Sequence, residues 1–259
     1  MPSYTRPGVE AAVRLSKLVD QANLWTSIEA KYGNMLVVKK KGNDELLRLD
    51  EACEELGKKW RAMLSEENEQ ENKTSECKAF MTCEELYQVM KWKFAKGKSR
   101  PLWKYINSNS EEAVKQCSSL AFSKIIENES NINEAIKEMS NLKGVGPAGS
   151  SAILSLFKPD LFVFMDDEVI ECLHTGKREY NLKVYNIIND KCNTIASELG
   201  DGWTPRRVGK ALWSAATVSA YSDERDLTLS ESNVSSKKPS DNEESMDARK
   251  NKRKRRRRF

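Results

Sequence analysis

Leu142-Lys143-Gly144-Val145-Gly146-Pro147, followed by Ala148-Gly149-Ser150-Ser151-Ala152 and later by Asp166-Asp167, is the stretch of sequence that decides the fold. Two glycines flank one apolar residue, and apolar residues recur at helical spacing on both sides, which predicts two helices joined by a tight hairpin. Such a corner presents backbone N–H groups at the start of a helix and therefore predicts a phosphate site. The acidic pair stands where the next helical pattern begins and offers a carboxylate for chemistry at a sugar carbon.

Helical patterns also extend outward from the hairpin in both directions. Thr82-Cys83-Glu84-Glu85 resembles a capping box, and Thr204-Pro205 is a good pair for the first positions of a helix. One short segment, Met35 to Val38, indicates a weak strand or turn instead. The sequence therefore predicts an all-helical bundle, with helices at 9–19, 46–64, 84–94, 110–117, 131–141, 148–157, 169 onward, 184–199 and 206–218.

Composition narrows the class of protein. The six cysteines are scattered and form no C-x-x-C pair, and His174 is the only histidine. These counts argue against a disulfide framework, a metal site, an iron–sulfur cluster and most histidine-based mechanisms, and they fit a reducing compartment. No apolar run is as long as a membrane span, and the N-terminus lacks a signal-peptide pattern, so we expect an intracellular protein without a membrane partner.

The charge is distributed unevenly along the chain. The net charge is +4, yet residues 1–220 hold equal numbers of basic and acidic residues. Residues 221–248 are rich in Ser, Asp and Glu, which predicts a disordered linker. The terminal run that follows is a nuclear localisation signal or a loose nucleic-acid arm, unless it is only a solvated charge run. Its basic residues are Arg249, Lys250, Lys252, Arg253, Lys254, Arg255, Arg256, Arg257 and Arg258.

These shifts divide the chain into three parts. Residues 65–78 are almost entirely polar and predict an exposed loop, so we place a soft boundary at about residue 78. Residues 1–78 are then an N-terminal helical segment packed on the core, residues 79–220 are the core that contains the hairpin, and residues 221–259 are the linker and the basic tail.

A second candidate for nucleic-acid binding precedes the hairpin. Basic residues alternate there with Trp92, Phe94, Trp103 and Tyr105, a pattern typical of a surface that follows a phosphate backbone and stacks bases. Alternatively, the aromatic residues belong to the core and the cations are their solvated neighbours. The residues that we expect to contact DNA are Lys93, Lys96, Lys98, Arg100 and Lys143, together with Gly144, Val145, Gly146 and Ala148 of the hairpin.

The hairpin resembles the motif of the helix-hairpin-helix DNA glycosylase superfamily. That motif reads Leu-Pro-Gly-Val-Gly, then a helix of small residues, then an Asp that begins the next helix; aligned without a gap, this Asp falls on Asp166. A eukaryotic group within or beside the superfamily is more similar, with Trp92-Lys93 and Gly97-Lys98-Ser99-Arg100-Pro101 upstream of the hairpin. Its Ser-Asp-Glu corresponds to Asp166-Asp167-Glu168 and would make Asp167 the shared acid. Both candidate catalytic residues, Asp166 and Asp167, therefore stay open.

The resemblance implies a DNA-binding protein of the glycosylase fold, and the basic tail, taken as a localisation signal, places it in the nucleus. The resemblance also implies a monofunctional, monomeric base-excision glycosylase that acts on double-stranded DNA, in which an Asp stabilises the cation at C1′ and orients water. Ala148 stands where bifunctional members carry a lysine, so no lyase step is expected, and Cys172 and Cys192 alone cannot hold an iron–sulfur cluster. A monovalent cation at the hairpin carbonyls is also implied. Two alternatives remain: a catalytically inactive DNA-binding protein, and a protein-interaction scaffold whose tail is read by the nuclear import machinery.

Overall fold

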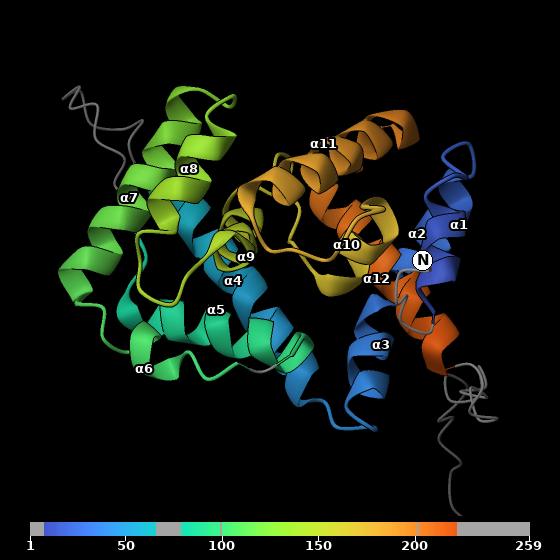
Figure 1. The fold of residues 1–259 in the computed structure, drawn as a ribbon, viewed down its shortest axis with the longest axis horizontal. Coiled ribbons are helices and arrows are strands. Elements are labelled where there is room, and N and C mark those ends of the chain that lie inside the picture. The colour runs from blue at the N-terminus through green and yellow to red at the C-terminus, as the bar shows by residue number, and fades with distance from the viewer. Residues whose placement is uncertain (1–7, 66–78, 99, 201, 222–259) are drawn as a thin grey trace, which may run out of the picture. The chain divides into compact units, whose positions relative to one another are not determined.

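A computed structural model describes residues 8–65, 79–98, 100–200 and 202–221 of the chain. These residues form helices and no strand, which confirms the predicted all-α class (Figure 1). In order, the helices are α1 (Val9–Leu15), α2 (Ala22–Glu29), α3 (Tyr32–Lys39), α4 (Glu45–Ser65), α5 (Cys83–Lys96), α6 (Trp103–Ile106), α7 (Glu111–Glu127), α8 (Ile132–Met139), α9 (Pro147–Phe157), α10 (Asp167–Leu173), α11 (Leu182–Leu199) and α12 (Pro205–Tyr221).

Side-chain caps fix where the helices begin. Thr82 and Glu85 form the predicted capping box at α5: the Thr82 hydroxyl accepts from the Glu85 N–H at 3.2 Å, and the Glu85 carboxylate accepts from the Thr82 N–H at 2.9 Å. The Ser110 hydroxyl caps α7 by accepting from the Ala113 N–H at 3.2 Å, and Pro205 is the first residue of α12. Because these caps satisfy N–H groups that the first helical turn leaves unpaired, the sequence predicted these helix starts well.

The helices differ from the predictions in three respects. Residues 35–38 are not a strand but part of α3, because Tyr32, Met35 and Leu36 are buried at the i, i+3, i+4 spacing of a helix. The helix predicted at 9–19 ends at Leu15. Helices α2 and α6 were not predicted at all, since each has eight residues or fewer and a weak sequence pattern.

The early helices pack against the end of the described chain. Helices α1, α2 and α3 all contact α12, and Figure 1 shows them as blue ribbons beside the orange one. Helix α4 packs against α5 and α9. One compact unit, which extends from Met1 to Glu224, contains every described helix.

Helix α9 is the centre of this packing. It contacts α4, α5, α8 and α11, and every residue from Ala148 to Phe157 is buried. A small residue on the neighbouring helix α4 lets the two backbones come close. At the crossing with α4, a Cβ atom on Gly57 would lie 2.4 Å from the Leu156 carbonyl oxygen, so only glycine fits there.

The predicted polar loop and the predicted linker with its basic tail lie mainly outside the residues that the structure describes. From residue 66 onward the predicted polar loop lies outside the described residues, and the linker and basic tail do so from residue 222. Within the described helices, none combines the length and the apolar character that a membrane crossing requires.

Candidate functional site

The predicted hairpin joins α8 to α9. Gly144 has φ = +79°, in the left-handed region, and the Val145 N–H donates to the Leu142 carbonyl at 3.0 Å. A Cβ atom on Gly144 would lie 2.9 Å from Ile106 Cγ1, so glycine is required both by conformation and by contact. Gly146 has ordinary extended geometry, and a Cβ atom there would meet nothing within 4 Å.

Asn109 holds the hairpin from outside. Its Oδ1 accepts from the Lys143 N–H at 2.8 Å, and its Nδ2 donates to the Lys143 carbonyl at 3.0 Å. The same Nδ2 donates to the Ile106 carbonyl at 2.8 Å. One amide side chain thus fixes the first arm of the hairpin to the segment between α6 and α7, and it is a positioning residue that the sequence pattern did not indicate.

The backbone N–H groups of the hairpin differ in whether they are free to bind a ligand. Val145 is buried and its N–H is used inside the turn, which corrects its predicted role as a phosphate contact. The N–H groups of Gly144, Gly146 and Ala148 donate no hydrogen bond to the described part of the chain. They stand at the N-terminus of α9, where the helix dipole favours an anion.

The segment before the acidic pair is tied to α9 and α11. The Ser151 hydroxyl accepts from the Met165 N–H at 3.0 Å, and Asn189 Oδ1 accepts from the Val163 N–H at 2.9 Å. These bonds satisfy backbone groups in a buried, non-helical stretch. A serine in the small-residue helix therefore sets the distance between the hairpin and Asp166.

Asp166 is enclosed with Lys96. The two charged groups are 2.8 Å apart, and each side chain is only 4% exposed. Asp166 also caps α10, accepting from the Asp167 N–H at 3.1 Å. Burial alone would raise the pKa of Asp166, but Lys96, Lys39 and the Asp167 N–H outweigh burial and lower it.

Four aromatic rings surround the Lys96 ammonium. Its Nζ lies 4.6 Å from the ring centre of Trp213, 5.0 Å from Tyr32, 5.4 Å from Phe164 and 5.8 Å from Trp92. Rings at these distances attract a cation through their faces. The prediction that Lys96 contacts DNA is therefore wrong, because the side chain points into the core, where Asp166 neutralises it.

Asp167 has a different environment. The Tyr180 hydroxyl donates to its Oδ1 at 2.5 Å, and Arg178 lies 3.4 Å from its Oδ2. Burial and the Asp167 carboxylate raise the pKa of Tyr180, so the phenol keeps its proton and remains the donor. The Arg100 guanidinium carbon lies 5.2 Å from the Tyr180 ring centre, within the range of a cation–π contact.

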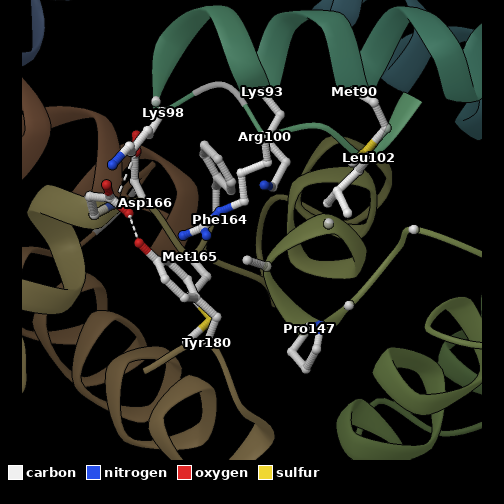
Figure 2. Close-up of a pocket in the computed structure, with 16 residues that line it drawn as sticks. Met90, Lys93, Lys98, Arg100, Leu102, Pro147, Phe164, Met165, Asp166 and Tyr180 are labelled. Atoms are coloured by element: carbon white, nitrogen blue, oxygen red, sulfur yellow. Dashed lines mark hydrogen bonds between the residues drawn. The ribbon is translucent and has the colours of Figure 1, made fainter. Parts of the chain in front are cut away.

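The hairpin, the acidic pair and the basic residues share one pocket of about 240 Å³ (Figure 2). Pro147 lies on one side, Asp166 and Tyr180 on the other, and Lys93 and Arg100 between them. The lining comprises Met90, Lys93, Gly97, Lys98, Arg100, Leu102, Gly144, Gly146, Pro147, Ala148, Gly149, Phe164, Met165, Asp166, Asp167 and Tyr180. The pocket thus combines amide donors, cations, carboxylates and aromatic faces.

The remaining sites predicted from the sequence divide between the pocket, the surface and the core. Lys93, Lys98 and Arg100 line the pocket with Gly144, Gly146 and Ala148, whereas Lys143 is exposed on the hairpin outside it. Trp92 and Phe94 are core residues, while Tyr105 is 55% exposed. The predicted nuclear localisation residues lie outside the described chain. Tyr180 and Arg178 were missed, because they follow the acidic pair in a segment without a helical pattern.

The described residues contain no group of three or more His, Cys, Asp or Glu side chains placed to hold a metal ion. The resemblance implies a monovalent cation at the hairpin carbonyls, of which those of Leu142 and Lys143 accept hydrogen bonds from Val145 and Asn109.

No protein-family model matches the chain, and no curated protein or solved structure is significantly similar to it.

Proposed function

We propose that this chain binds DNA through the hairpin and acts on a nucleotide that enters the adjoining pocket, as a monofunctional base-excision glycosylase. One observation carries the proposal: unengaged hairpin amides, three cations and the Asp167 carboxylate line the same pocket. Separate phosphate sites and acidic pairs are common, but their meeting in one concave site favours chemistry on a phosphorylated sugar.

The hairpin holds the phosphate in this proposal. The amides of Gly144, Gly146 and Ala148 point to the anion, and the dipole of α9 adds to their attraction. Lys98 and Arg100 are exposed at the rim of the pocket, where their positive charges attract the phosphate backbone of the DNA. The nucleotide leaves the duplex and enters the pocket, where Phe164 and Tyr180 offer ring faces to the base.

Asp167 is the acid that we assign to the chemistry. Tyr180 and Arg178, which hold it, are typical partners of an ionised carboxylate. A fixed negative charge beside C1′ stabilises the cation that develops as the base leaves, and it orients the attacking water. Asp166 supports α10 and the buried Lys96 instead.

One observation also favours a second candidate, DNA binding without chemistry. Asp166 is neutralised by Lys96, and Asp167 is already engaged with Tyr180 and Arg178. A site in which both carboxylates are engaged can serve recognition alone. Phosphate binding at the hairpin is common to both candidates, so it is tested first.

A charge placed on Gly146 tests the phosphate site without disturbing the fold. In a chain ending at Glu224, which removes the basic tail, Gly146→Glu is expected to weaken duplex binding relative to Gly146→Gln by about ten- to thirtyfold, or about 1–2 kcal/mol. Both side chains fit the open space at position 146. The carboxylate suits the start of α9 but repels a phosphate.

Fluorescence anisotropy with a duplex that carries a tetrahydrofuran abasic analogue measures this difference at low salt. Equal dissociation constants for the two variants, or no binding by the unsubstituted chain, would contradict the proposed function.

A further inference from the structure

Lys93 lines the pocket beside the hairpin, and the proposed mechanism gives its amine no part in the chemistry. It leaves α5 one turn before Lys96, and Figure 2 shows its side chain directed into the pocket. Its amine makes no hydrogen bond or ion pair with the described residues. Its nearest aromatic contact is Phe94, whose ring centre lies 5.1 Å away.

The surroundings of Lys93 favour the neutral form of its amine, whereas the amine of an ordinary surface lysine stays protonated. Burial lowers its pKa, Arg100 acts in the same direction, and Asp166 and Asp167 oppose the change without cancelling it. A larger neutral fraction means that the nitrogen lone pair is available to an electrophile. Nevertheless, the lysine is open to the pocket, because its side chain is only partly buried.

The neighbouring lysines show that this position is distinctive. Lys96 is sealed among aromatic rings with Asp166, whereas Lys98 and Lys91 are exposed. Only Lys93, among the lysines of this segment, combines an unpaired amine with partial burial and a cavity that also contains the hairpin amides.

We propose that Lys93 is a nucleophile that forms an imine with an aldehyde carried next to a phosphate. The inference rests on the proposed function, under which this aldehyde is the open-chain deoxyribose of an abasic site. The hairpin would hold the adjoining phosphate and present C1′ to the amine. Although Ala148 leaves the hairpin without a lysine, α5 thus supplies one to the same pocket.

The step balances as an ordinary condensation. The Lys93 nitrogen gives its lone pair to C1′, and the carbonyl π electrons move to oxygen. Proton transfer from nitrogen to oxygen, with one further proton from solvent, allows the oxygen to leave as water. The product is a protonated C=N bond, which water hydrolyses in reverse and which borohydride reduces to a stable secondary amine by donating a hydride.

Borohydride trapping tests the inference on the full chain. A duplex with an abasic site is incubated with protein and borohydride, and the adduct is mapped by mass spectrometry. The adduct is expected on Lys93 and is expected to be lost in both Lys93→Met and Lys93→Arg. The arginine variant keeps the positive charge, and thermal unfolding checks that both variants fold. Lys91→Met, on the exposed face of α5, is the matched control and is expected to trap normally.

Each result decides the question. Trapping that disappears in both Lys93 variants but persists in Lys91→Met supports the inference. If the protein prefers a duplex with a tetrahydrofuran analogue, which has no aldehyde, over undamaged duplex but gives no adduct, the inference is overturned and the proposed function stands. An adduct on another lysine also overturns it. If the protein shows neither this preference nor an adduct, both proposals fail.

Discussion

Lys96→Met is expected to lower the free energy of unfolding by about 3–5 kcal/mol at neutral pH, the range found when one partner of a buried ion pair is removed. Methionine keeps most of the volume among the four aromatic rings, so cavity formation contributes little. The cost comes from Asp166, whose side chain is 4% exposed and loses its ammonium partner. Urea unfolding followed by circular dichroism measures the change.

The pH dependence of this effect follows from the direction of the Asp166 shift. The pKa of Asp166 is lower in the folded chain than in the unfolded one. The ionised carboxylate therefore adds to the free energy of unfolding at pH values above the unfolded pKa, and this contribution is lost as the pH falls toward the folded pKa. The difference between the wild type and Lys96→Met is therefore expected to narrow on acidification.

A double variant separates charge from packing. Asn caps a helix about as well as Asp, so Asp166→Asn keeps the N-cap of α10 while removing the charge. Lys96→Met combined with Asp166→Asn is expected to be more stable than Lys96→Met alone, because no unpaired charge remains. If Lys96→Met and the double variant have the same free energy of unfolding, the stability of the aromatic enclosure does not depend on the ion pair.

Asp167→Asn is expected to reduce base release by about 100- to 1000-fold while duplex affinity stays within about threefold, since a preorganised charge acts mainly on the transition state. The amide keeps the size of the side chain and can still accept from Tyr180. Single-turnover release from a panel of damaged and mismatched duplexes measures the effect.

Asp166→Asn is the matched control for that experiment. The neighbouring carboxylate is engaged with Lys96, so its loss is expected to affect unfolding more than base release in folded protein. A robust activity that is unchanged in Asp167→Asn would refute the assigned mechanism. Binding without release by the unsubstituted chain would instead favour the second candidate.

The sequence predicted the elements whose signals are local. The Thr82–Glu85 box, the Gly144 turn and the Pro205 start are each determined by a few adjacent residues, and all three are present. The prediction of a strand or turn at residues 35–38 was wrong, because two adjacent valines favour a strand. In the structure, the buried residues of α3 instead follow helical spacing from Tyr32.

The arrangement of the site depended on packing that the sequence pattern does not contain. Lys93, Lys96 and Lys98 look alike in sequence, yet Lys93 lies in the pocket, Lys96 in the core and Lys98 at the exposed rim of the pocket, just after α5 ends. The choice between Asp166 and Asp167 was open for the same reason. It depends on Lys96 and Tyr180, which lie 70 residues before Asp166 and 13 residues after Asp167.

Amide chemical shifts of the hairpin test the central claim most directly. In a ¹⁵N-labelled chain ending at Glu224, titration with the tetrahydrofuran duplex is expected to move the amide signals of Gly144, Gly146 and Ala148 most. Val145 is expected to move less, because its N–H remains bonded to the Leu142 carbonyl. If these three signals stay in place while the duplex binds, or if the largest changes lie on helices away from the pocket, the hairpin is not the phosphate site.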